Sequence, residues 1–134
     1  MNRRYHLGEL TLEITRRCPL RCLLCSSNGG QPYTDEMGSD KWRGIIDEAF
    51  ALGTRTIIFS GGEPFASPLL IPLCKYATRK AMGVYIYTSG NVENEGLKPL
   101  GEKLLITLRE SRVRKIMFSL HGPNASVHDH MTGL

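Results

Sequence analysis

The sequence predicts an α/β protein built around a parallel sheet. Apolar or alternating runs of strand length occur four times, and stretches with helical periodicity separate them. Each run is followed by a loop that contains Cys, Gly, Ser, Thr, Asn or His residues. Strand, loop and helix recurring in this order are typical of right-handed βαβ units, so we expect about four such units in one domain, residues 1–134.

The first unit begins with residues 10–15, where apolar and polar side chains alternate and predict a strand that ends just before Cys18. A polar, Gly-rich stretch follows over residues 26–38. An amphipathic helix comes next, with Ser39 or Asp40 as its expected cap and Gly53 as its stop. The apolar side chains that recur at helical spacing in it are Trp42, Ile45, Ile46, Ala49 and Phe50.

The second and third units are marked by short β-branched runs. Residues 56–60 are continuously apolar, as in a strand buried on both faces, and lead into the segment Gly61-Gly62-Glu63-Pro64. A helix that opens at Ser67 and Pro68 and is closed by Gly83 should follow. Residues 84–87 predict the third strand, which ends in Thr88-Ser89-Gly90-Asn91.

The fourth unit is predicted from a weaker helix and a clear strand. Leu97, Leu100, Leu104 and Leu108 would face inward on a helix over residues 97–111, although Pro99 and Gly101 weaken its start. Residues 116–120 predict the fourth strand, followed by His121-Gly122-Pro123 and a short tail to residue 134. We therefore expect a sheet of four strands.

Composition and charge exclude several classes of protein. The longest apolar runs are far shorter than the ~20 residues that cross a bilayer. Strand-like residues follow Arg3 and Arg4, so no signal peptide is predicted. The net charge of +4 is scattered, and its tightest cluster, between the last helix and strand, is typical of a solvated face. We expect a cytoplasmic protein that binds neither membrane nor nucleic acid.

Three of the four cysteines form the segment Cys18-Pro-Leu-Arg-Cys22-Leu-Leu-Cys25. Random placement at this frequency gives about 0.003 matches to such a spacing. A disulfide would leave one thiol unpaired, and a structural zinc site normally has four ligands. Cys74 shares a helical apolar stripe and is better explained as core packing. Three thiolates suit an iron–sulfur cluster that keeps one iron open to a small molecule.

The loops with unusual residues all follow strands. In parallel sheets and α/β barrels this edge holds the active site, so the cysteines, the Gly-Gly-Glu segment and the Thr-Ser-Gly-Asn segment should converge.

In motif, order and position, these residues resemble the radical S-adenosylmethionine (radical SAM) superfamily, and the resemblance covers nearly the whole chain. The family's CxxxCxxC motif matches Cys18, Cys22 and Cys25. The resemblance implies a TIM-like (β/α)6 barrel, of which this chain would form a partial barrel that stops after the fourth strand. Residues 119–130 most resemble the peptide- or protein-modifying members, those of SPASM type, although branches that act on small molecules look similar there.

The resemblance also implies cofactors and site residues. The three cysteines would ligate a 4Fe-4S cluster, and S-adenosylmethionine would bind its open iron. Backbone carbonyls around Gly61 and Gly62, together with the Glu63 carboxylate, would accept from the methionyl amine. The remaining positions, which offer short polar groups to the carboxylate and ribose, are Thr88, Ser89, Asn91 and Ser119.

The implied reaction is reductive cleavage to a 5'-deoxyadenosyl radical that abstracts hydrogen from a substrate, with an electron donor such as flavodoxin or ferredoxin. Leu24 departs from the family pattern, which often has an aromatic residue at that position. Two other classes remain open: a non-catalytic iron–sulfur or zinc module, and a truncated subunit that needs a partner chain or associates through its open sheet edge. His121, His128 and His130 are better explained by local capping or exposure than by a second metal site.

Overall fold

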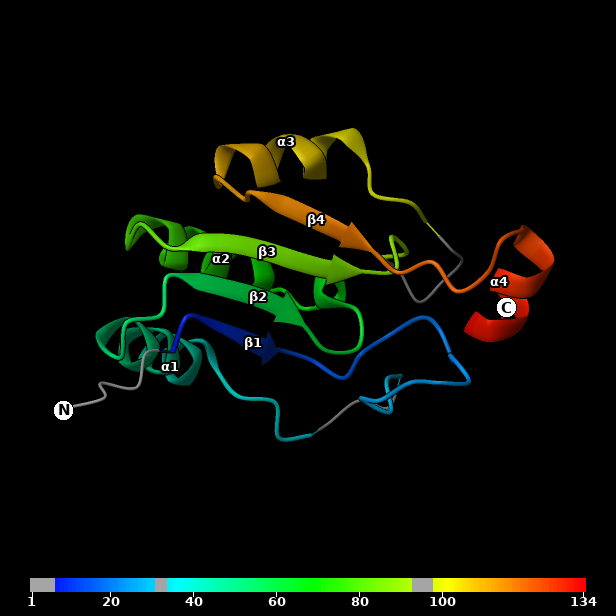
Figure 1. Cartoon of the computed structure of the whole chain (residues 1–134), viewed down its shortest axis with the longest axis horizontal. Helices are drawn as coiled ribbons and strands as arrows, with labels where there is room; N and C mark the ends of the chain where they lie inside the picture. Colours follow the sequence, from blue (N-terminus) through cyan, green and yellow to red (C-terminus); the bar gives the residue numbers. More distant parts are fainter. Residues whose placement is uncertain (1–6, 31–33, 93–97) are drawn as a thin grey trace, which may run out of the picture.

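The chain folds as an open, four-stranded parallel sheet with its helices beside it (Figure 1). A computed structural model describes residues 7–30, 34–92 and 98–134. The strands stand in sequence order, β1 (Glu9–Glu13), β2 (Thr56–Ser60), β3 (Gly83–Thr88) and β4 (Lys115–Phe118). The helices are α1 (Ser39–Ala51), a 3-10 turn η1 (Pro64–Ala66), α2 (Leu70–Arg79), α3 (Glu102–Glu110) and α4 (Ala125–Thr132). The predicted fold class is confirmed, and the sheet is not closed.

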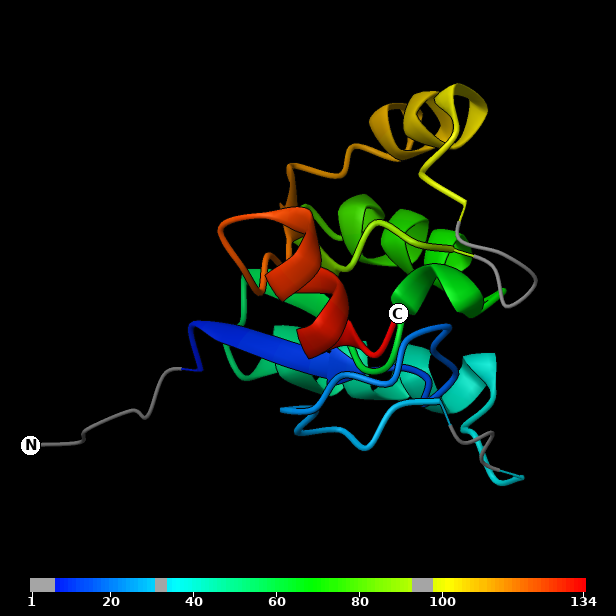
Figure 2. The same ribbon diagram turned by 90° about the vertical axis from the view of Figure 1, so that its right-hand side faces the viewer.

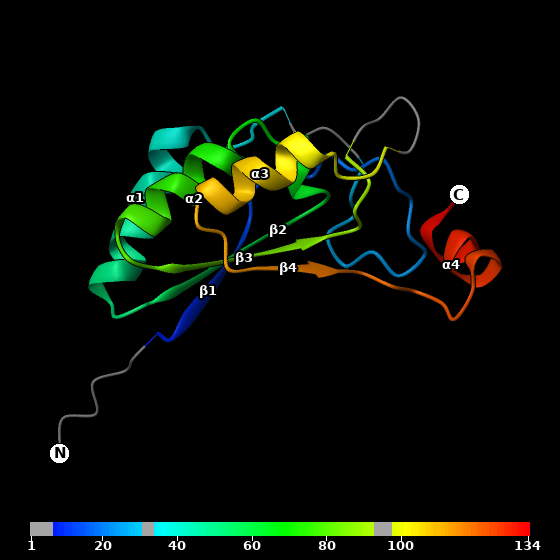
Figure 3. The same ribbon diagram turned by 90° about the horizontal axis from the view of Figure 1, so that it is seen from above.

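Helices α1, α2 and α3 cover one face of the sheet, as the view from above shows (Figure 3). Alternate residues of each strand point to this face, because successive side chains in a strand point to opposite sides. One such row runs across the sheet as Leu12, Phe59, Ile86 and Ile116, which are paired in register. The row packs against Ile46 of α1 and against buried residues of the other two helices, namely Leu73, Cys74, Ala77 and Leu108.

The other face of the sheet carries a mixed row. Thr11, Ile58, Tyr85 and Lys115 are paired in register across the four strands. The Lys115 ammonium lies 5.4 Å from the centre of the Tyr85 ring, and Tyr87 further along β3 is 42% exposed. In Figure 3, none of the helices of the described residues covers this face of the sheet.

The ends of α1 and α2 differ from the predicted ones. Helix α1 is capped by Gly38 without a side-chain bond, so Ser39 and Asp40 are its first residues rather than its cap. Helix α2 begins at Leu70, after the 3-10 turn that contains Pro64. The chain leaves α2 through Ala81 at φ +59°, whereas Gly83, the expected stop, is the first residue of β3.

The last third of the chain contains the helices α3 and α4, and only α3 was predicted from the sequence. Helix α3 begins at Glu102, later than expected, with Leu108 buried and Leu104 packed against the core; Leu97 lies outside the described residues. The expected tail after β4 contains α4, whose first turn is capped by the Asn124 side chain accepting from Val127 N at 3.0 Å. Gly133 ends this helix at φ +74°, a conformation in which glycine is favoured.

Among residues 7–30, 34–92 and 98–134, no helix is long and apolar enough to span a membrane.

Candidate functional site

The carboxyl ends of the four strands meet at one edge of the sheet, where the loop after β1 lies next to α4 (Figure 2). We call residues 17–30, which contain the three clustered cysteines, the cysteine loop. The Gly-Gly-Glu turn (residues 61–63) follows β2, the Thr-Ser-Gly-Asn turn (residues 88–91) follows β3, and Ser119 follows β4. The predicted convergence of these segments at one edge is therefore observed.

The Gly-Gly-Glu turn lies directly on the backbone that leads into the cysteine loop. Gly62 N donates to Thr15 O at 2.8 Å, and Glu63 N donates to Arg17 O at 2.7 Å. A Cβ at Gly62 would collide with the Arg17 carbonyl oxygen and lie 2.8 Å from the carbonyl carbon of Arg16. Gly61 adopts φ +125°, which side chains disfavour, and a Cβ there would collide with the Thr15 carbonyl oxygen. Both glycines are therefore required by close backbone approach.

The cysteine loop brings its first and last cysteines to Gly29. A Cβ on Gly29 would lie 3.3 Å from Cys18 Cβ, 3.4 Å from Gly62 Cα and 3.6 Å from Cys25 Sγ. Gly29 N also donates to Cys25 Sγ at 3.1 Å. Cys18 and Cys22 are half-buried and Cys25 is exposed. The described residues hold no group of three His, Cys, Asp or Glu side chains arranged around a single metal ion.

The local environment raises the pKa of two of the three thiols, those of Cys18 and Cys22. Burial raises the pKa of the Cys18 thiol, and the nearby Glu63, Cys22 and Cys25 raise it further. Burial also raises the pKa of Cys22, with a further contribution from Cys25. Thiolates rather than thiols are metal ligands, so a metal that bound at this loop would displace protons from these thiols. Cys22 and Cys25 thus act on Cys18, and Cys25 acts on Cys22.

Cys74 lies away from this loop. It is fully buried on α2, and burial raises the pKa of its thiol to about 12. A thiol in such surroundings is inert, so the prediction that Cys74 packs in the core is confirmed.

The Glu63 side chain is turned into the protein. It is fully buried, and its Oε1 accepts from Thr88 Oγ1 at 2.7 Å and from Phe65 N at 3.3 Å. Its Oε2 accepts from Ser89 Oγ at 2.7 Å and Ser89 N at 3.0 Å. A carboxylate offers about four acceptor positions, and these four bonds fill them. In this geometry, Glu63 joins the turns after β2 and β3, and its contact with a ligand amine stays a prediction.

The hydroxyls after β3 are used in the same network. Thr88 Oγ1 also accepts from Gly90 N at 2.9 Å, and Ser89 Oγ accepts from Asn91 N at 3.2 Å. Ser119 is half-buried at the end of β4, where its N–H donates to Thr88 O at 2.9 Å. Of the polar residues that the sequence nominates, Thr88 and Ser89 thus hold the turn together, while Asn91 and Ser119 lie at its margin.

The contact between α4 and the cysteine loop was not predicted from the sequence. Arg21 N donates to Thr132 O at 3.0 Å, and Leu23 N donates to Met131 O at 2.9 Å. The signals that could have revealed this helix are Asn124, a favoured N-cap residue, and Gly133, a favoured C-terminal stop. Leu24, where the family often has an aromatic residue, is 78% exposed.

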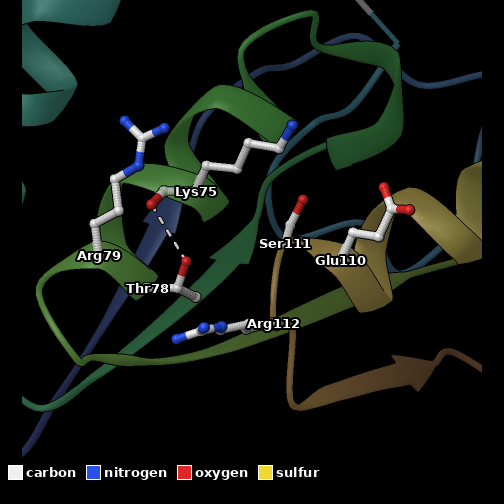
Figure 4. A pocket seen from close by; sticks show the side chains of 6 residues that line it. All are labelled: Lys75, Thr78, Arg79, Glu110, Ser111 and Arg112. Carbon is white, nitrogen blue, oxygen red and sulfur yellow. Dashed lines mark hydrogen bonds between the residues drawn. The ribbon is translucent and has the colours of Figure 1, made fainter.

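A hollow of about 380 Å³ lies at the opposite edge of the sheet, between the ends of α2 and α3 (Figure 4). Lys75, Arg79 and Arg112 line it together with Glu110, and in Figure 4 the three cationic side chains point in different directions. Helix carboxyl ends carry partial negative charge, which cations in the last turn stabilise. Arg79, in the last turn of α2, is explained in this way, and the hollow is not part of the site.

Fold and site geometry together define a class: a partial α/β barrel with a three-cysteine loop and a glycine turn packed at the carboxyl edge of its sheet. The model of the radical SAM superfamily matches residues 12–133. The chain belongs to the radical SAM superfamily, and the resemblance seen in the sequence is confirmed.

Curated relatives of this chain are enzymes with different named activities. It is 30% identical over 127 residues to a PqqA peptide cyclase of Rhodopseudomonas palustris, an alignment that covers 91% of this chain and 31% of the relative. It is 32% identical over 123 residues to an AdoMet-dependent heme synthase of Oleidesulfovibrio alaskensis, covering 91% of this chain and 30% of the relative. The chain thus spans about a third of the length of these relatives.

Solved structures share the fold. Streptococcus suis SuiB, in a crystal structure with its precursor peptide SuiA, superposes with a TM-score of 0.78 at 18% identity. The match covers 96% of this chain and 28% of SuiB. BtrN in complex with AdoMet and 2-DOIA superposes with a TM-score of 0.69 at 22% identity, covering 96% of this chain and 53% of BtrN.

Proposed function

We propose that this chain is the cluster- and cofactor-binding part of a radical SAM enzyme, with Cys18, Cys22 and Cys25 as ligands of a 4Fe-4S cluster. The observation that carries the proposal is the packing of the Gly-Gly-Glu turn against the cysteine loop, with Gly62 Cα and Cys25 Sγ at 3.4 and 3.6 Å from the Cβ position of Gly29. A turn held so close to two of the cysteines supports a small molecule bound beside them. A purely structural metal site would not need such a turn.

The donor set fits a cluster better than one ion. Thiolates that hold a 4Fe-4S cluster bind separate irons, so they stand further apart than the ligands of a single ion. Cys18 and Cys25 lie beside Gly29, and Cys22 lies between them in the same loop, so the three thiols can serve separate irons of one cluster. The Gly29 N–H that donates to Cys25 Sγ is a hydrogen bond of the kind that tunes cluster sulfurs.

When bound, the reduced cluster would supply one electron to the sulfonium of S-adenosylmethionine, whose S–C5' bond would break to give methionine and a 5'-deoxyadenosyl radical for hydrogen abstraction. The chain's own contribution is to hold the cofactor beside the open iron. Backbone carbonyls around Gly61 and Gly62 would serve as acceptors for the methionyl amine, and Asn91 and Ser119 would offer polar groups to its carboxylate or ribose. We assign to Glu63 a positioning role: its carboxylate fixes Thr88 and Ser89 relative to the glycine turn.

The substrate that we favour is a peptide. PqqA peptide cyclase and SuiB, whose names and complexes involve peptides, both match this chain over most of its length. The uncovered face of the sheet, with Tyr85, Tyr87 and Lys115, offers aromatic and cationic contacts for such a substrate. A flavodoxin or ferredoxin would supply the electron.

We also propose that a further polypeptide segment or a second copy covers the outer edge of β4, because this strand has a sheet neighbour on one side only among the described residues. Unpaired strand edges favour association.

Anaerobic reconstitution of the chain with iron and sulfide tests the function. The expected product is a brown protein with about four irons per chain that binds S-adenosylmethionine in a calorimetric titration. Cys22→Ala should lose iron, and Cys74→Ala, the matched control, should retain it. Stoichiometric zinc binding without iron, or full iron in Cys22→Ala, would exclude the cluster and favour the non-catalytic module.

A further inference from the structure

Helix α4 and the cysteine loop complete each other's backbone hydrogen bonding. The last four carbonyls of a helix have no partner within it. Two of those of α4, Met131 O and Thr132 O, accept instead from Leu23 N and Arg21 N, at 2.9 and 3.0 Å. These two donors flank Cys22, so the middle cysteine lies between two residues tied to one helix end.

The contact is close as well as hydrogen-bonded. Thr132 is only 1% exposed, and Leu20 in the facing loop is 2% exposed. A Cβ on Gly133 would lie 2.7 Å from Arg21 O and 3.0 Å from Arg21 Cβ. Gly133 is therefore required both by its φ of +74° and by the backbone of the cysteine loop beside it.

The other two cysteines are held differently. Cys18 and Cys25 contact Gly29, on the returning part of the loop, which Gly30 N ties to Arg16 O at 2.7 Å. Cys25 N donates back to Cys22 O at 3.2 Å, which makes residues 22–25 a turn. Among the bonds of the described residues, those from α4 are the ones that fix the segment on both sides of Cys22.

We propose that α4 is a positioning element for the cluster site. Its last turn holds Cys22 at the distance from Cys18 and Cys25 that binding to one shared cluster requires. This inference rests on the proposed function for its consequence, namely cluster retention. The placement of Cys22 itself can be measured in the metal-free chain. Met131, Thr132 and Gly133 act through the loop and do not touch the cluster.

Gly133→Ala is the first test, because its Cβ pushes the last turn of α4 off Arg21. In the metal-free chain, alkylation by iodoacetamide, mapped by mass spectrometry, should become about fivefold faster at Cys22, the change expected for losing one net hydrogen bond from local opening. Cys18 and Cys25 should keep their rates. Amide exchange of Arg21 and Leu23 should accelerate in parallel.

Gly53→Ala is the matched control. Gly53 also follows a helix end with positive φ, +97°, but lies at the other edge of the sheet, before β2. It carries the same backbone strain without contact to the cysteine loop, so the reactivity of Cys22 should stay at the wild-type value.

Leu23→Pro tests the hydrogen bond without touching α4. Leu23 is 62% exposed and occupies the second position of the turn over residues 22–25, where proline is favoured. The substitution deletes the N–H that donates to Met131 O. Faster alkylation at Cys22 is expected, and the reconstituted variant should release iron to a ferrous chelator about fivefold faster than wild type.

Wild-type reactivity of Cys22 in both Gly133→Ala and Leu23→Pro would overturn the proposal, as would an equal increase at all three cysteines, which would indicate general loosening. If the wild-type chain binds no cluster, the proposed function fails, while the alkylation and exchange measurements still decide whether α4 holds Cys22. Far-ultraviolet circular dichroism of each variant verifies that it is folded.

Discussion

Replacing glycine by alanine at two positions should change stability in opposite directions. Gly44 lies inside α1 with nothing within 4 Å of a Cβ, so Gly44→Ala adds a better helix former in open space. Gly62 has no room for a Cβ against the backbone of Arg16 and Arg17. Its φ lies outside the left-handed region, so Gly62→Ala tests the collision rather than backbone strain.

The magnitudes follow from these contacts. Alanine is about 1 kcal/mol better than glycine inside a helix, which is the expected gain at Gly44. At Gly62 the turn must move away, which weakens the bonds from Gly62 N to Thr15 O and from Glu63 N to Arg17 O. Two net hydrogen bonds at about 1 kcal/mol each, plus about 1 kcal/mol of overpacking, give a loss of about 3 kcal/mol.

Thermal unfolding of the metal-free chain, followed by circular dichroism, measures both effects. For a domain of this length, 1 kcal/mol corresponds to about 3.5 °C in the melting temperature. Gly44→Ala should therefore melt about 3.5 °C above wild type and Gly62→Ala about 10 °C below it. A Gly62→Ala chain that melts at the wild-type temperature would refute the packing of the glycine turn on the strand that leads to the cysteines.

Three other outcomes are expected. Glu63→Ala should lower the free energy of unfolding in urea by about 3 kcal/mol, because Phe65 N and Ser89 N lose their buried acceptor. The control Glu48→Ala, on the exposed side of α1, should change it by less than about 0.5 kcal/mol. Equal effects of the two variants would contradict the buried hydrogen-bond network around Glu63. Cys74→Ala should lower the free energy of unfolding by about 1 kcal/mol, because it leaves a small void in the core, and should leave the iron content after reconstitution unchanged. A loss of iron in this variant would place Cys74 in the metal site. Light scattering over a dilution series should show self-association, unless a fragment that supplies further strands is added; a strict monomer at all concentrations would contradict pairing through the edge of β4.

The arrangement of the sheet could be predicted because local patterns set it. The continuous apolar run of β2 indicates a strand buried on both faces, and the alternating pattern of β1 indicates a half-buried strand. The observed burial of the two strands agrees with these patterns. Helix ends were less predictable, because the chain leaves α2 through Ala81 in a left-handed conformation that propensities disfavour. Helix α4 was missed because it has eight residues, with few apolar side chains to produce a helical period.

For the site, sequence spacing was sufficient to nominate the cysteines and the glycine turn, but not the partners of Glu63. Those partners lie 25 and 26 residues further along the chain, and their approach depends on the pairing of β2 with β3. A carboxylate in a glycine-rich turn has the same sequence pattern whether it points to a ligand or into the protein. Only tertiary structure separates the two, and here it places the carboxylate in the interior.

This burial changes which groups at the carboxyl edge are left to recognise a small molecule. The side chains nearest the strands, Glu63, Thr88 and Ser89, satisfy one another and connect two turns. Under the proposed function, recognition would then rely on groups with hydrogen-bonding capacity left over, above all carbonyl oxygens, which have two lone pairs each. Such groups are placed by the backbone, and the backbone here is placed by glycines at close approaches and by the end of α4. Under the proposed function, the precision of the site would therefore depend on residues that act through the backbone and not by contact with the ligand.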